Sequence, residues 1–143
     1  MSTEELHAIE LLGRVPYGRL ATSLRALPFL AVARHVVTGG RVVLRMHRGL
    51  GYHKACNGSV IAYGADNLNT AASSDNDADL WSVQFTGPAR IVQPSPEQRA
   101  LFGTPPVEVN GEPFDPVYLR LQPHFITVHT LGFHASPRIS HSA

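Results

Sequence analysis

The residues best suited to chemistry gather in one segment, RVVLRMHRGLGYHKACNGSVIAYGAD, which spans residues 41–66. An apolar run ends there in basic residues, crosses a turn containing Gly49 and Gly51, and is followed by a second apolar run. The side chains that carry or can acquire positive charge are Arg45, His47, Arg48, His53 and Lys54. Cationic side chains and backbone N–H groups that converge on one point suit an anion such as a phosphate. A solvated basic loop between two strands is the open alternative.

Other chemistries find less support in the sequence. The eight histidines match no known metal-ligand spacing, so we expect no metal site. Cys56 follows Lys54, which could lower its pKa, but a lone cysteine is more often a small packing residue than a nucleophile. No G-x-S-x-G elbow occurs. Trp81 is the only tryptophan and suits the core, a subunit contact or a platform for a planar ring.

Composition limits the architecture and the partners. With 143 residues and 43% hydrophobic content, the chain is long enough for one domain, which we place at residues 1–135 with a flexible tail at 136–143. Twelve Lys and Arg against eleven Asp and Glu give a net charge of +1, which argues against nucleic-acid binding. One cysteine excludes an internal disulfide, and we expect no membrane segment and a cytoplasmic protein.

The first half of the chain predicts a helix followed by strands. Residues 2–12 have helical spacing of apolar positions and end at Gly13. Short runs rich in β-branched residues follow at 18–24, 28–37 and 41–46, and Gly39-Gly40 predicts a hairpin between the last two. A short helix should begin near Tyr52. A fourth strand is expected at 59–66, followed by a mobile polar loop at 67–79.

The second half predicts further strands and one helix. Residues 79–93 alternate apolar and polar side chains and bend at Gly87-Pro88, as in a long kinked strand. A capped helix is expected at about 95–102 and an irregular connection at 104–116. The last strand, or pair of strands, is interrupted near Gln122-Pro123. Short strands with few helices predict an all-β fold, a closed or nearly closed antiparallel barrel of six strands with short peripheral helices.

The order of these elements resembles the pyridoxamine 5'-phosphate oxidase-like family, and within it the small nitroimidazole-resistance-related branch. The resemblance rests on VPYGRLATS, LPFLAVARHVV-GG-RVVLRMHRGLGYHKA, SVIAYGAD, WSVQFTGPARIV and PVYLRLQPHFITVHT, and covers about residues 5–130. It implies a six-stranded split β-barrel that forms a homodimer. It also implies FMN, or in some members a deazaflavin or haem, bound in grooves at the subunit interface.

The resemblance also implies the residues that bind the cofactor. The end of the third strand and the following turn and helix grip the flavin phosphate in this family, and the backbone of the second strand lines the flavin ring. The matching positions here are Val32, Ala33, Arg45, Met46, His47, Tyr52, His53, Lys54, Trp81 and Ser82. Met46 stands where relatives often carry a hydroxyl residue. The second strand lacks the basic residues of true pyridoxamine-phosphate oxidases, which argues against the vitamin B6 reaction.

Two functions follow from these observations. The first is a flavin-dependent oxidoreductase acting on a small molecule of unknown identity, in which the cofactor performs the redox chemistry and no catalytic side chain is assigned. The second is a non-catalytic barrel that sequesters a flavin, deazaflavin or haem, favoured by the absence of an evident acid-base pair. An oligonucleotide-binding barrel is disfavoured by the net charge.

Overall fold

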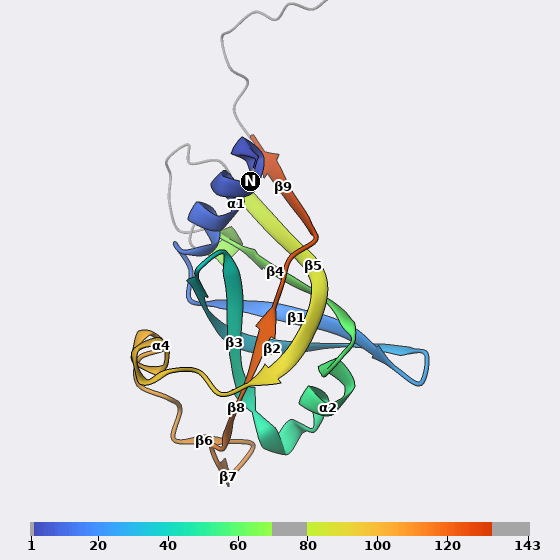
Figure 1. The fold of residues 1–143 in the computed structure, drawn as a ribbon, viewed down its shortest axis with the longest axis vertical. Coiled ribbons are helices and arrows are strands. Elements are labelled where there is room, and N and C mark those ends of the chain that lie inside the picture. Colours follow the sequence, from blue (N-terminus) through green and yellow to red (C-terminus); the bar gives the residue numbers. More distant parts are fainter. Residues whose placement is uncertain (1, 70–79, 133–143) are drawn as a thin grey trace, which may run out of the picture.

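The computed structural model describes residues 2–69 and 80–132 and shows a closed β-barrel (Figure 1). Its strands are β1 (Tyr17–Leu24), β2 (Leu27–Thr38), β3 (Arg41–His47), β4 (Val60–Asp66), β5 (Leu80–Val92), β8 (Pro116–Leu121) and β9 (Phe125–Leu131). The antiparallel ring runs β4-β1-β2-β3-β8-β5 and closes through β5 and β4. The predicted six-stranded antiparallel barrel is therefore confirmed, and β9 adds a seventh strand alongside β5.

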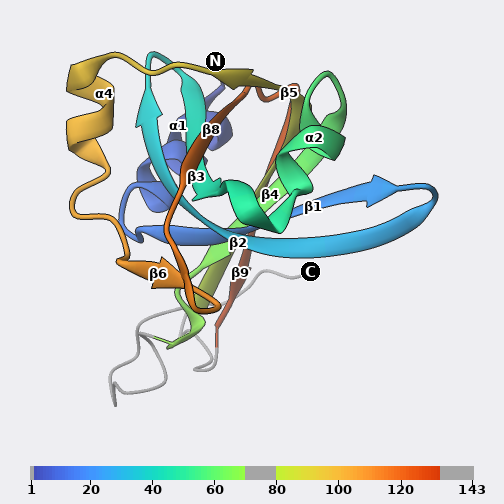
Figure 2. The same cartoon turned by 90° about the horizontal axis from the view of Figure 1, so that it is seen from below.

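Short helices surround the barrel at the positions that the sequence predicts. Helix α1 (Thr3–Leu12) begins at a capping box formed by Ser2 and Glu5, and α4 (Pro96–Leu101) begins at a second one formed by Ser95 and Gln98. A 3₁₀ turn, η1 (Arg48–Leu50), leads into α2 (Tyr52–Cys56). Figure 2 shows α4 beside one flank of the barrel and α2 between β3 and β4 at another. No helix in the described ranges has the length and apolar character needed to cross a membrane.

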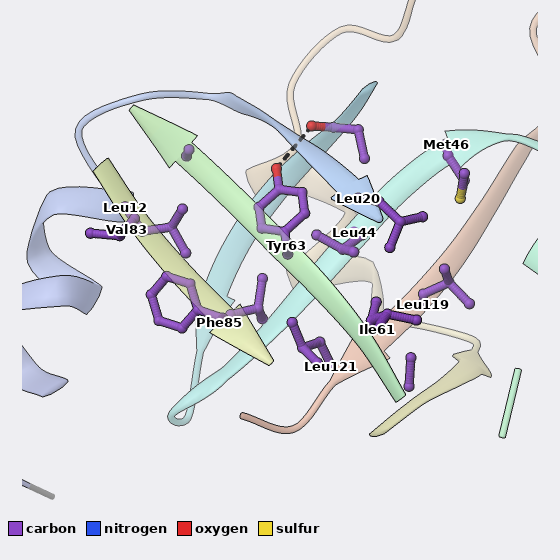
Figure 3. Packing of buried hydrophobic residues seen from close by; sticks show 14 of the residues in the cluster. Leu12, Leu20, Leu44, Met46, Ile61, Tyr63, Val83, Phe85, Leu119 and Leu121 are labelled. Carbon is purple, nitrogen blue, oxygen red and sulfur yellow. Dashed lines mark hydrogen bonds between the residues drawn. The ribbon is translucent and has the colours of Figure 1, made fainter. Parts of the chain in front are cut away.

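Alternation of side chains along the strands fills the barrel interior. Inward residues of β4 and β5, such as Tyr63 and Phe85, are fully buried, whereas their neighbours face outward. Side chains from β1, β2, β3, β4, β5, β8 and α1 meet in this core, part of which Figure 3 shows. The labelled members are Leu12, Leu20, Leu44, Met46, Ile61, Tyr63, Val83, Phe85, Leu119 and Leu121.

Strand β3 is unusual because it is covered on both faces. Its inward residues join the barrel core, and its outward residues Val43, Arg45 and His47 are also buried. Val43 packs in a second small core with Val36, Phe102 and Tyr118. The cover on this outer face comes from α4 and from the chain that follows it.

One segment departs from the sequence-based expectation. Residues 104–116, predicted as irregular, contain a two-stranded hairpin of β6 (Glu108–Val109) and β7 (Glu112–Pro113). Asn110 and Gly111 form its turn, both at positive φ. The Asn-Gly dipeptide is a strong hairpin signal, but strands of two residues show no alternation that would confirm it. Most of the predicted loop at 67–79, and the predicted tail at 136–143, lie outside the described residues.

Candidate functional site

The outer face of β2 and β3 carries a cavity of about 230 Å³, which we call the β2–β3 cavity. Its floor is formed by residues 32–34 of β2 and 45–47 of β3, and Tyr17 and Leu50 lie at its borders. One wall comes from the segment between α4 and β8, here called the strap (residues 103–115). The strap residues that line the cavity are Pro106, Val109 and Phe114.

Arg45 is the only buried guanidinium in the described chain, and it lines this cavity. The residue is 5% exposed, and its guanidinium lies 5.2 Å from the ring centre of Phe102 and 5.7 Å from that of Phe114. It donates one hydrogen bond, to the carbonyl oxygen of Gly103 at 3.3 Å. No carboxylate in the described part of the chain pairs with it. A desolvated cation with one neutral acceptor has unused capacity for an anion.

Arg34 faces Arg45 directly across the β2–β3 ladder, and three of its five N–H donors are already used. Its guanidinium donates to the carbonyl oxygens of His35, Pro16 and Leu101. Two like charges in register repel each other, and these carbonyls hold Arg34 in place beside Arg45. Of the two arginines in the β2–β3 cavity, Arg45 is therefore the one with more N–H donors left for a ligand.

His47 is positioned by two hydrogen bonds and is not available as a ligand. Its Nε2–H donates to Glu112 Oε1 at 2.9 Å, and its Nδ1 accepts from the backbone N–H of Asp115 at 3.1 Å. This pair of bonds fixes the tautomer with the proton on Nε2. The adjacent Arg48 pairs with Asp115 at 3.4 Å. Two of the residues that sequence analysis assigned to a free basic turn thus tie β3 and η1 to the end of the strap.

Helix α2 places its three candidate residues in different environments. The ring of Tyr52 stacks on Phe29 with centroids 4.4 Å apart and packs against the barrel core. His53 is 5% exposed, and its Nδ1 has no hydrogen-bond partner among the described residues. Burial, and then the charges of Arg48 and Lys54, lower the pKa of His53. Lys54 is exposed and makes no ion pair within residues 2–69 or 80–132.

Cys56, also on α2, is fully buried in the core. Burial raises the pKa of its thiol to about 11, which is the opposite of the effect considered from the neighbouring Lys54. The desolvation of a fully buried thiol outweighs a lysine whose charge lies in solvent. Cys56 is therefore a packing residue, and its thiolate is not available for nucleophilic chemistry.

Trp81 and Ser82 lie on another part of the barrel. Trp81 is 8% exposed and belongs to the core, whereas Ser82 faces outward into a separate cavity of about 280 Å³. The floor of that cavity is made of small residues, including Ala21, Ala62 and Gly64. Within one chain, the structure thus brings Val32, Ala33, Arg45, Met46 and His47 together and leaves Trp81 and Ser82 apart from them.

A buried polar cluster supports the floor of the β2–β3 cavity from inside. The hydroxyl of Tyr63 lies within hydrogen-bond distance of the carbonyl oxygen of Ala33, at 3.0 Å, and of the Nδ1 of His35, and its one proton can serve either acceptor. The Nε2–H of His35 donates to the carbonyl oxygen of Leu12. Burial lowers the pKa of His35 and raises that of Tyr63, so both groups stay neutral. Met46 likewise packs in the barrel core while lining the cavity.

Sequence reasoning missed the residues that enclose the cavity. Its borders and wall include Leu50, which lies within the basic segment, and also Tyr17 and the strap residues, which lie far from that segment in the chain. Asn110-Gly111 was the one local signal that the strap folds back on itself. Among the described residues, no three His, Cys, Asp or Glu side chains gather in a way that could hold a metal ion.

Comparisons with solved structures show the same fold in other proteins. The FAD binding protein from Mycobacterium smegmatis is 22% identical, with a TM-score of 0.67 over 94% of this chain and 98% of its own. The FAD and heme binding protein from the same organism is 13% identical, with a TM-score of 0.65 over 96% of this chain and 76% of its own. A flavocytochrome from Azotobacter vinelandii is 16% identical, with a TM-score of 0.62 over 98% of this chain and 71% of its own.

Sequence comparisons agree with the fold. No curated protein matches the chain at a significant level. The family model described as pyridoxamine 5'-phosphate oxidase matches residues 4–130, which include every strand of the barrel and most of β9. The family resemblance inferred from the order of the elements is confirmed, and the chain belongs to the pyridoxamine 5'-phosphate oxidase family.

Proposed function

We propose that the protein binds a flavin, with FMN as the expected form, in the β2–β3 cavity and acts as a flavin-dependent oxidoreductase. The observation that carries this proposal is Arg45, a buried cation without a carboxylate partner in the described chain, set in a largely apolar cavity. Apolar and aromatic walls with a few fixed polar groups suit a planar ring. Arg45 would hold an anionic group of the cofactor, either the phosphate or the electron-rich edge of the ring.

The cofactor would supply the redox chemistry, while this chain would bind it, orient it and exclude water. Val32 and Ala33 offer the backbone of β2 as the floor, which Tyr63 fixes from behind. The cavity lining contains no carboxylate, and both nitrogens of its one histidine, His47, are engaged. Hydride transfer at a flavin needs no protein acid-base pair, so this lining fits such a reaction.

A homodimer would complete the site. Val32 is 59% exposed and Leu30 is 64% exposed on the outward face of β2, next to the cavity that Ser82 lines. Exposed apolar residues on a surface of small side chains are typical of a subunit contact. A second copy packed on this face would cover the open side of the β2–β3 cavity and bring Trp81 and Ser82 of one chain toward the ligand held by the other.

The direct test is to purify the protein and titrate it with FMN while following the visible absorption of the flavin. We expect a saturable spectral shift and a bound fraction that survives gel filtration. A flavin spectrum that stays identical to that of free FMN at all protein concentrations would rule out the proposal. The same titration with a deazaflavin and with FAD distinguishes the form of the cofactor.

Non-catalytic storage of a flavin is the second candidate, favoured by the lack of a free acid or base in the cavity. Repeated reduction of the bound flavin by NADH or NADPH and reoxidation by an added acceptor would exclude it. A haem would need a protein side chain as an iron ligand. The nitrogens of His47 are already used, so Tyr17 and Met46 are the side chains of this lining that could serve.

A further inference from the structure

The strap (residues 103–115) holds Arg45 from both of its ends. Near its beginning, the carbonyl oxygen of Gly103 accepts the hydrogen bond from Arg45. Near its end, the ring of Phe114 lies against the guanidinium of Arg45 and is stacked on His47 at 5.8 Å with an interplanar angle of 26°. The geometry of the group that would receive an anion therefore depends on how the strap is attached to β3.

His47 makes the part of that attachment that reaches Glu112, and Arg48 adds an ion pair with Asp115 at the end of the strap. His47 donates from Nε2 to the carboxylate of Glu112 and accepts at Nδ1 from the backbone of Asp115, so it joins two points of the strap to the end of β3. The side chain of His47 is 4% exposed, whereas that of Glu112 is 62% exposed. Water can compete for the carboxylate, so this bond is one that can open and close.

Gly49 shows that the chain keeps space for this bond. A Cβ at this position would lie 2.5 Å from Glu112 Oε1 and 2.5 Å from His47 Nε2, the two atoms that the bond joins. Its φ is not in the left-handed region, so backbone conformation alone does not require glycine here. The absence of a side chain at Gly49 is thus explained by the close approach of Glu112 to His47.

We propose that the hydrogen bond between Glu112 and His47 is a latch that holds the strap over the β2–β3 cavity and sets how long a bound flavin stays. Glu112 is a positioning residue: it acts on Arg45 and Phe114 through the strap and does not itself touch the ligand. This inference rests on the proposed flavin site. In the proposed dimer the second copy covers the open side of the cavity, so a ligand that has Phe114 and Arg45 around it leaves when the strap moves, and the latch governs that step.

The test compares FMN association and dissociation rates in four variants. Glu112→Ala removes the acceptor, Glu112→Gln keeps an acceptor oxygen for the Nε2–H, and Gly49→Ala forces the two partners apart. Glu108→Ala is the matched control, because Glu108 is an exposed acid on the same hairpin without a hydrogen bond to His47. We expect dissociation about fivefold faster or more in Glu112→Ala and Gly49→Ala, with association changed less than about twofold. Glu112→Gln and Glu108→Ala should stay near the wild-type rates.

Two results would overturn the latch. The first is a rate of FMN dissociation from Glu112→Ala that is no faster than that from Glu108→Ala. The second is a rate from Glu112→Gln as fast as that from Glu112→Ala, because the loss of a negative charge would then explain the faster dissociation. A second measurement does not need the flavin. Nitrogen-15 spectra of the ligand-free protein should show His47 with its proton on Nε2, and amide exchange at Phe114, whose N–H donates to Val107, should quicken in Glu112→Ala.

This second measurement separates the two proposals. If wild-type protein binds no FMN, the proposed function fails, and the latch is then judged on the ligand-free protein alone. A Phe114 exchange rate that is the same in wild type and Glu112→Ala would refute it. Faster exchange at Phe114 in Glu112→Ala, with the wild-type rate restored in Glu112→Gln, would support it.

Discussion

Arg45 illustrates a conflict between stability and binding at the scale of one residue. A buried guanidinium with a single carbonyl acceptor loses hydration that two aromatic rings and one hydrogen bond replace only in part. An anion held in the proposed flavin site would offset this cost. The exposed Lys54, which sequence analysis named in the same basic segment, carries no comparable penalty.

The variant Arg45→Met should therefore separate the effect of Arg45 on stability from its effect on flavin binding. The free energy of unfolding of the ligand-free protein should stay equal to that of the wild type or rise, because an apolar side chain of similar length replaces a buried unpaired charge. The dissociation constant for FMN should rise about tenfold or more, since a charge-assisted contact is worth roughly 1.5–3 kcal/mol. Urea unfolding and FMN titration measure the two quantities.

Lys54→Ala is the comparison that locates the anion. Notable loss of FMN affinity in this variant, with little change in Arg45→Met, would place the phosphate at α2 and not in the β2–β3 cavity. We expect the opposite ranking, with the larger loss in Arg45→Met, because the donors of Arg45 are desolvated and those of Lys54 are in water.

His35 gives a prediction on pH. Its pKa in the folded protein lies below 6.5 because of burial, whereas the unfolded chain takes up a proton at about 6.5. The free energy of unfolding should thus fall as the pH drops below about 6.5 and level off below the lowered pKa of the folded state. Urea unfolding across this range should show a weaker fall in His35→Gln. The lowered pKa of His53 also makes the free energy of unfolding fall at low pH, and His53→Gln should remove only the part that His53 contributes. A pH profile in His35→Gln that is the same as in the wild type would contradict the prediction.

At the scale of elements, the hairpin of β1 and β2 contains an unfavourable turn. Arg25 and Ala26 connect the strands with φ values of 54° and 67°, a conformation that favours glycine and asparagine. Figure 2 shows this hairpin extending away from the rest of the barrel. The two residues adopt left-handed conformations because the pairing of Leu24 with Leu27 leaves only two residues for the connection.

Ala26→Gly should stabilise the protein by about 1 kcal/mol, the cost of holding a non-glycine residue in the left-handed region. Ala21→Gly, inside β1 and at ordinary φ, is the control and should destabilise it. Thermal or urea unfolding of both variants gives the comparison. A loss of stability in Ala26→Gly would mean that the turn relaxes in solution to a conformation with negative φ.

The elements that the sequence predicts are those with local signals. Ser2 and Ser95 cap α1 and α4, and Gly39-Gly40 forms the predicted hairpin because both residues adopt positive φ. The strap escaped prediction because its strands have two residues each. The partners of Arg45 could not be predicted either, since they depend on where residues 102–114 cross the outer face of β3, and no local pattern determines that path.

At the scale of the whole molecule, the exposed apolar residues on the outward face of β2 lead us to expect a homodimer. Leu30→Glu should convert a two-chain species to single chains in sedimentation velocity, because a charge in an apolar contact is costly. Leu6→Glu, which changes an equally exposed leucine on α1, is the matched control and should leave the mass unchanged. A wild-type protein that sediments as a single chain at all concentrations would refute the proposed dimer.

The long strand β5 has a further consequence for how the molecule opens. It pairs with β4 along one edge and with β8 and β9 along the other. The ring therefore cannot open at either edge of β5 without breaking the hydrogen bonds of this strand. Amide hydrogens in its middle, such as that of Phe85, should exchange with solvent only when the whole barrel unfolds. Those of the strap need only local opening. One deuterium-labelling experiment would thus compare the local opening of the strap with the unfolding of the whole protein.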